Sequence, residues 1–187
     1  MSGSCLVYVL KEETLSVSDK LQVLNELLRL LAGYVESGGR PIHFRSSNIY
    51  IDSASNKLVG LSQAVVQEWS YRLAEQLNKT MIGQGAEEFI YSSPEQITEE
   101  HATVSQTAVY RLGVVLFELL TGEPPFTGDM SSVMQQHMTA AVPQIELDSQ
   151  MADKALNQKI QALVAKMMCK AASDRPSWLD LLGDLSS

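Results

Sequence analysis

The sequence has few cysteines and no long hydrophobic run. The first argues against a disulfide-rich protein, and the second argues against a membrane-spanning one. Two cysteines among 187 residues, Cys5 and Cys169, cannot build a disulfide framework. We therefore expect reduced, buried thiols in a cytoplasmic protein. The longest apolar run, Leu112 to Phe117, is far too short to cross a bilayer. The first four residues show no signal-peptide pattern, so we expect no direct membrane insertion.

An excess of positive charge is also absent. The chain carries 14 lysines and arginines against 22 aspartates and glutamates, a net charge of −8. This balance argues against nucleic acid as a partner and favours a protein or peptide, with a basic one complementing the net charge. Apolar residues make up 45% of the sequence, enough for one ordinary core, and neither repeats nor low-complexity segments occur. We expect a single domain spanning residues 1–187.

Hydrophobic periodicity predicts a mainly helical chain with a few short strands. The stretch Thr107–Thr121 is apolar on nearly all sides, which indicates a buried central helix. Ser16 to Asp19 form a capping-box pattern that opens another helix with a leucine-rich face. The remaining predicted elements are strands at Cys5–Val9, Ile49–Ile51 and Lys57–Leu61, and helices at Ala64–Leu77, Ser131–Met138, Asp153–Lys170 and Trp178–Leu185.

Several motifs in a fixed order together resemble the C-lobe of a protein kinase. Ser93-Pro94-Glu95-Gln96 is similar to the end of a kinase activation segment, and Thr107 to Phe126 to the central helix and its following turn. The segments 45–52 and 172–177 resemble the tail of the catalytic loop and a later Arg-Pro element. The resemblance runs from about Leu6 to Leu185 and implies a helical bundle around the central helix, with the N-lobe absent.

The positions that carry catalysis in the family differ here. Aligned on Asn48, the catalytic aspartate becomes His43, and the catalytic-loop lysine becomes Arg45. Gly60 stands where the family has a magnesium ligand, which would leave Asn48 to hold the metal alone. The aspartate of the central helix, which tethers the catalytic loop in the family, is replaced by Ala108. We therefore expect no metal, no cofactor and no ATP binding.

The resemblance also implies a structural ion pair. In the family, the residues that match Glu95 and Arg175 form a buried pair that joins the activation segment to the last helices. Removing one partner of such a pair would leave an uncompensated buried charge. We expect Glu95 and Arg175 to stabilise the domain and to take no part in chemistry.

Candidate partner-binding residues lie in three places. The predicted helix Ala64–Leu77 has the least family support and carries two aromatic residues. Two methionines lie one turn apart on the predicted helix Ser131–Met138, and pairs of glutamates flank the Ser93–Gln96 motif. The candidates are Trp69, Tyr71, Glu87, Glu88, Glu99, Glu100, Met134 and Met138.

These features predict a protein that is not an enzyme. The sequence favours a scaffolding module that binds protein partners, similar in architecture to the kinase non-catalytic C-lobe domain. One alternative is the C-terminal lobe of a longer regulatory serine/threonine pseudokinase, and another is a divergent active serine/threonine kinase. The absent N-lobe and Gly60 argue against the last.

Overall fold

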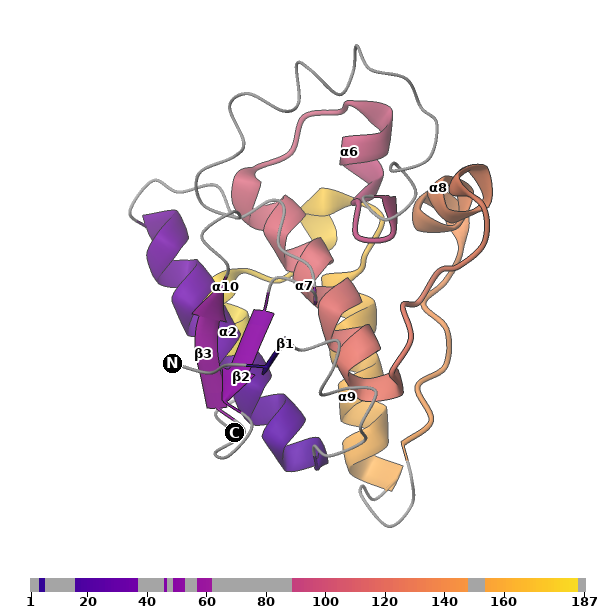
Figure 1. Ribbon diagram of the computed structural model, residues 1–187. Coiled ribbons are helices and arrows are strands. Elements are labelled where there is room, and N and C mark those ends of the chain that lie inside the picture. Colours follow the sequence, from indigo (N-terminus) through magenta and orange to yellow (C-terminus); the bar gives the residue numbers. More distant parts are fainter. Residues whose placement is uncertain are drawn as a thin grey trace.

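The computed structural model describes residues 4–5, 16–36, 46, 49–52, 57–61, 89–147 and 154–184. Figure 1 shows one helix through the middle of the fold, with another helix and the strands on one side of it. The elements, in chain order, are β1 (Ser4–Cys5), α2 (Val17–Glu36), β2 (Ile49–Asp52), β3 (Lys57–Leu61), α6 (Pro94–Thr98), α7 (Val104–Thr121), α8 (Met130–Thr139), α9 (Lys154–Met167), η2 (Ala172–Asp174) and α10 (Trp178–Asp184). The expectation of a mainly helical, C-lobe-like fold is confirmed.

The helix α7 is the centre of the core. Every residue from Thr107 to Leu120 is buried, because the sequence offers an apolar side chain on nearly every face. The helix begins three residues earlier than the pattern predicts, since Thr103 caps it: the Thr103 hydroxyl accepts a hydrogen bond from the Gln106 amide at 3.2 Å. It ends at Gly122, whose φ of 83° is the left-handed conformation that glycine adopts without strain.

The helix α2 packs against α7, β3 and α10. Its predicted capping box is confirmed: the Asp19 amide donates to the Ser16 hydroxyl at 3.1 Å, and the Ser16 amide donates to the Asp19 carboxylate at 3.2 Å. The buried face presents Val23, Leu24, Leu27, Leu28 and Leu31 to the core. Spacings of three and four residues place these side chains on one stripe.

The three strands form one small antiparallel sheet in the order β1-β2-β3. The strands β2 and β3 match the predicted ranges, with Ile49 and Ile51 turned into the core. Gly60 lies in β3 opposite Tyr50. Within the described residues the first strand pairs at Ser4 and Cys5, and the rest of the predicted strand Cys5–Val9 lies outside them. The predicted helix Ala64–Leu77 also lies outside them.

The helix α9 packs closely against α7. A Cβ atom placed on Gly113 would lie 2.7 Å from Cγ of Met168, so glycine is what lets the two backbones approach. Cys169 follows as a free, half-buried thiol, and the prediction of a buried cysteine is wrong at this position. No helix within the described ranges is long and apolar enough to cross a lipid bilayer.

Candidate functional site

A buried ion pair joins α6 to the turn after η2. The Arg175 guanidinium donates from Nη1 and Nη2 to the two carboxylate oxygens of Glu95, each at 2.7 Å. The same guanidinium donates to three backbone carbonyls, those of Cys169 at 2.8 Å, Gln106 at 3.0 Å and Lys170 at 3.1 Å. One side chain therefore ties α6, α7 and the end of α9 together.

The surroundings of Glu95 keep its carboxylate ionised. Thr107 donates a further hydrogen bond to Glu95 at 2.9 Å, and the Arg175 guanidinium lies 4.8 Å from the centre of the Tyr110 ring. Burial by itself would raise the pKa of Glu95, but the hydrogen bonds and charge of Arg175 outweigh it and hold the pKa below its usual range. The pair is therefore fully charged at neutral pH.

The sequence around Glu95 fixes the short helix that carries it. Pro94 occupies the first turn of α6, where its missing N–H costs no hydrogen bond. The Ser93 amide and hydroxyl both donate to the Gln96 side chain, at 3.1 and 3.2 Å. Glu99 ends the helix in the left-handed conformation, with φ of 59°. These local signals hold Glu95 in position to meet Arg175.

A second buried carboxylate, that of Glu118, lies in the last turn of α7. Glu118 accepts hydrogen bonds from the Ser46 hydroxyl at 3.0 Å and the Tyr91 hydroxyl at 2.8 Å. The Ser46 and Tyr91 oxygens also lie 2.9 Å apart, so the three side chains form a closed cluster. Burial raises the pKa of Glu118, and the two hydrogen bonds oppose that rise. The cluster connects α7 to two segments that are distant in sequence.

A third polar cluster lies between α7 and α8. His137 is fully buried; its Nδ1 lies 2.9 Å from the Tyr110 hydroxyl, and its Nε2 lies 2.9 Å from the Ile90 carbonyl oxygen. The Phe126 ring meets the imidazole edge-on at 4.9 Å. The Lys170 ammonium lies 4.8 Å from the centre of the Phe126 ring. Burial lowers the pKa of His137 to about 4 and that of Lys170 to about 8.

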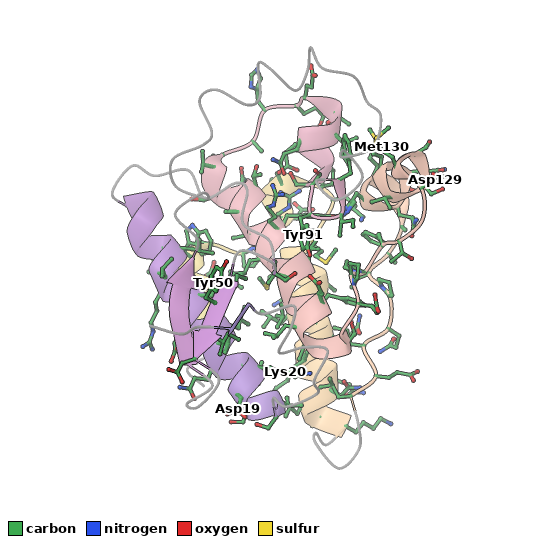
Figure 2. The ribbon with its side chains drawn as sticks, in the orientation of Figure 1. Asp19, Lys20, Tyr50, Tyr91, Asp129 and Met130 are labelled. Carbon is green, nitrogen blue, oxygen red and sulfur yellow. The ribbon has the colours of Figure 1, made fainter. Side chains whose placement is uncertain are left out.

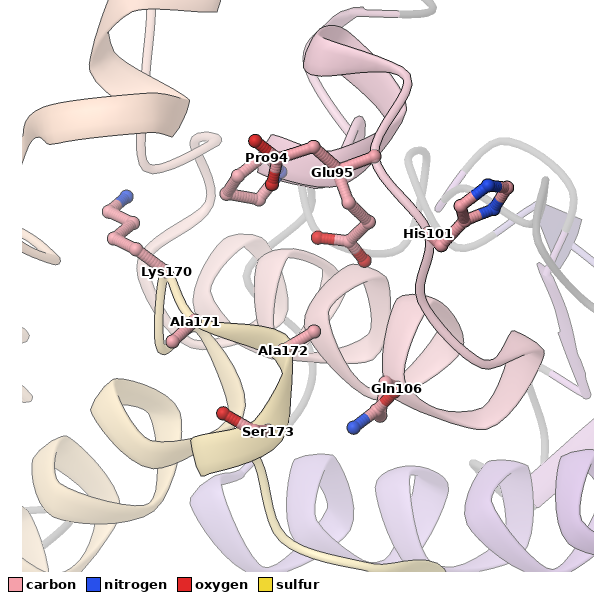
Figure 3. Close-up of a pocket in the computed structure, with 9 residues that line it drawn as sticks. Pro94, Glu95, His101, Gln106, Lys170, Ala171, Ala172 and Ser173 are labelled. Carbon is pink, nitrogen blue, oxygen red and sulfur yellow. The ribbon is translucent and has the colours of Figure 1, made fainter.

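A pocket of about 320 Å³ opens beside the ion pair. Figure 3 shows the Glu95 carboxylate in its middle, with His101 on one side and the turn after α9 on the other. The residues that line it are Pro94, Glu95, Glu100, His101, Gln106, Lys170, Ala171, Ala172 and Ser173. The lining mixes both signs of charge, so it selects neither a cation nor an anion.

The helix α8 presents methionines at the edge of the molecule. Met130, Met134 and Met138 follow one another at spacings of four residues, which places them on one helix face. Met138 is 40% exposed, and the other two are partly exposed. Figure 2 shows Met130 and Asp129 at the outer end of α8. On the neighbouring face, Val133 and His137 are buried and anchor the helix.

The structure places only part of the predicted site. Among the catalytic-type positions, His43, Arg45 and Asn48 lie outside the described residues, while Ala108 is fully buried in α7. Of the proposed partner contacts, Met138 is exposed, Met134 is partly exposed, and Glu99 and Glu100 are exposed at the end of α6. The other candidates, Trp69, Tyr71, Glu87 and Glu88, lie outside the described residues.

Sequence reasoning missed the clusters around Glu118 and His137. A lone carboxylate in an otherwise apolar helix is a signal that could have revealed the first, because a buried charge needs hydrogen-bond donors. His137 lies one turn after the apolar Val133, a spacing that places the imidazole on the buried face of α8.

Comparison with known proteins gives a consistent result. Residues 45–184 match the family described as protein kinase domain. The chain is 34% identical to serine/threonine-protein kinase PknE of Mycobacterium tuberculosis over 108 residues, which cover 58% of this chain and 18% of the relative. It is 27% identical to the probable serine/threonine-protein kinase PknB of Lactococcus lactis over 142 residues, 74% of this chain and 21% of the relative. PknB of Mycobacterium tuberculosis is 38% identical over 86 residues, 46% of this chain and 13% of the relative.

These relatives correct one prediction. The expectation that the chain is not an enzyme is contradicted, since the matched family and the relatives named serine/threonine-protein kinases point to a kinase enzyme. The prediction relied on substitutions such as His43 and Gly60, and these do not outweigh the match along most of the chain. The comparisons give no support to the narrower assignment to pseudokinases. The chain spans about a fifth or less of the length of these relatives.

Proposed function

Because the chain belongs to the protein kinase domain family, we propose that it is the C-lobe of a serine/threonine kinase-type signalling protein and binds a protein partner. The single observation that carries the proposal is the methionine face of α8, where Met138 is exposed and Met130 and Met134 are partly exposed, in an acidic part of the chain. A C-lobe within a longer signalling protein would use this face for scaffolding. A cytoplasmic location and a single domain stay predictions.

Charge supports a basic partner. Between residues 80 and 153 the sequence contains eleven aspartates and glutamates, of which Glu95 and Glu118 are buried, and one lysine or arginine, Arg111, which is also buried. Asp129 is exposed at the N-cap of α8 and Glu123 in the turn after α7, and Glu99 and Glu100 are exposed at the end of α6, which contacts α8. A field of one sign attracts a partner of the opposite sign and speeds their encounter.

The methionines supply the apolar part of the surface. Methionine side chains are unbranched and polarisable, and they adapt to partners of different shape. An amphipathic helix with lysines or arginines beside its apolar face would match both features of this surface. The anchoring of α8 by Val133 and His137 means that little ordering is needed when a partner binds.

The test is a binding titration with a labelled peptide of about four helical turns, leucine on one face and lysine on the other. Fluorescence anisotropy should detect binding by the basic peptide and none by the same peptide with glutamate for lysine. Met134→Ser and Met138→Ser should each weaken binding about fivefold or more. Leu30→Ser is the matched control, because Leu30 on α2 is 39% exposed and Met138 is 40% exposed. Equal loss in all three variants would refute the proposed surface.

A second candidate function is protein phosphorylation, favoured by the names of the relatives. Its test is transfer of labelled γ-phosphate from magnesium ATP to the basic peptide carrying one serine. Label on the peptide would support a kinase that binds its substrate here. Binding without label would leave docking as the function of this chain.

A further inference from the structure

His137 is the only described side chain of α8 that is both buried and polar. Its imidazole uses both ring nitrogens, one toward Tyr110 of α7 and one toward the Ile90 carbonyl, each at 2.9 Å. The Ile90 carbonyl belongs to the segment that leads into α6. The residue therefore touches three parts of the fold at once.

The chemistry of the contacts fixes how the imidazole is protonated. A carbonyl oxygen only accepts hydrogen bonds, so Nε2 of His137 must carry the proton that it donates to Ile90. Nδ1 is then the acceptor for the Tyr110 hydroxyl. The positive charges of Lys170 and Arg111 add to burial in opposing a second proton. The neutral ring thus holds one defined orientation.

Ile90 and Tyr110, the two hydrogen-bond partners of His137, each lie next to other polar contacts of the fold. Tyr91, which follows Ile90, donates to Glu118, and Ser93 and Glu95 lie just beyond it. Tyr110 is stacked under the Arg175 guanidinium, which holds Glu95. A displacement of α8 therefore acts on the segment from Ile90 to Glu95 in two ways. One is the direct hydrogen bond from His137 to Ile90, and the other passes through Tyr110 and Arg175 to Glu95.

We propose that His137 couples partner binding on the methionine face of α8 to the position of the segment Ile90–Glu95. The proposal rests on the proposed function, because it assigns a consequence to binding at that same surface. A bound partner holds α8 against the body of the fold and so preserves the hydrogen bond from His137 to Ile90. By linkage, loosening the segment weakens partner binding by the same factor.

Hydrogen exchange measured on the full chain by mass spectrometry tests the coupling. Adding the basic peptide should slow exchange of the amides in the segment 89–95 about fivefold or more, in the range of ordinary coupling. In His137→Phe, which keeps a ring and loses both imidazole hydrogen bonds, the peptide should bind more weakly by the coupling factor and, at saturating concentration, leave this exchange unchanged. His101→Phe is the matched control, since His101 is exposed. If the peptide still slows amide exchange in the segment 89–95 of His137→Phe, the coupling is overturned and the proposed function stays intact.

A second measurement needs no peptide and separates failure of the coupling from failure of the docking surface. Val133→Ala loosens α8 from within, because Val133 is buried on that helix. In the wild-type background, Val133→Ala should speed amide exchange in the segment 89–95. In a chain that already carries His137→Phe, adding Val133→Ala should not change that exchange rate further. Tyr110→Phe is a gentler variant that keeps the ring and the bond from His137 to Ile90 but removes the hydroxyl contacts with His137 and Lys170, and it should give an intermediate result. Additive effects of Val133→Ala and His137→Phe would overturn the proposal.

Discussion

Arg175 and Glu95 lie eighty positions apart in sequence and meet through two parallel hydrogen bonds of 2.7 Å. Both side chains are buried, and Arg175 also binds carbonyl groups of α7 and of the residues after α9. This geometry makes the pair a junction between the segment before α7 and the last helices. Several expected outcomes follow from the junction and from the clusters around it.

Arg175→Ala should destabilise the domain strongly. The substitution leaves the Glu95 carboxylate buried without its counter-charge, a loss of roughly 3–5 kcal/mol in unfolding free energy. Urea unfolding followed by circular dichroism measures the change. The double variant Arg175→Ala with Glu95→Gln should recover part of the loss, because it removes the stranded charge. An unchanged midpoint in Arg175→Ala would contradict a structural role for the pair.

Gly113→Ala should destabilise the contact between α7 and α9. The added methyl group would lie 2.7 Å from Cγ of Met168 and 3.0 Å from Cβ of Met167, which forces a shift that costs about 1–3 kcal/mol. Met168→Ala in the same chain should relieve part of the strain, and thermal unfolding of the variants compares them. Gly33→Ala is the matched control, because nothing lies within 4 Å of a Cβ at that helical position. There the unfolding free energy should rise by about 0.5–1 kcal/mol.

Acid should weaken the fold partly through His137. Its pKa is lowered from 6.5 to about 4, so the unfolded chain takes up a proton at a pH where the folded chain does not. Stability is therefore complete above about pH 6.5 and falls as the pH drops toward about 4, by up to about 1.4 kcal/mol per pH unit. Urea unfolding of wild type and His137→Gln should give a difference that shrinks over this window. An imidazole resonance of His137 that titrates near its ordinary pKa would contradict the burial argument.

Tyr91→Phe should show the cost of removing one of the two hydroxyl donors of Glu118. The Tyr91 hydroxyl donates one hydrogen bond to this buried carboxylate and the Ser46 hydroxyl donates another, so loss of the first should cost about 1–3 kcal/mol. Chemical denaturation measures the loss. Tyr50→Phe is the control, because Tyr50 is half-buried in β2 and lies outside this cluster. Equal effects at the two tyrosines would show that the cluster contributes nothing specific.

The core could be predicted from the sequence, and the polar clusters could not. The helix α7 was predictable because its apolar run leaves no exposed face, and Glu95 and Arg175 each lie in a motif with a known counterpart. For Glu118 and His137 the sequence signals burial but not the partners, because Ser46, Tyr91 and Ile90 come from distant segments. Such contacts depend on how the elements pack, which local patterns do not encode.

The prediction about enzymatic activity was wrong for a different reason. Substitutions at His43 and Gly60 were weighed as losses of chemistry, although single positions say less about a family than the match over residues 45–184. The partner prediction rests on the acidic character of the chain and stays a prediction. This acidic character lies largely in residues 80–153, the part of the chain that contains α8.

The most direct test of the docking surface is a titration observed on methionine methyl groups. The chain has eight methionines, and selective ¹³C labelling gives each a separate resonance. On addition of the basic amphipathic peptide, the methyl groups of Met134 and Met138 should shift in a saturable way. Those of Met167 and Met168, buried beneath α7, should stay unchanged. Shifts confined to other methionines, or none at saturating peptide, would contradict the assignment of the α8 face as the partner-binding surface.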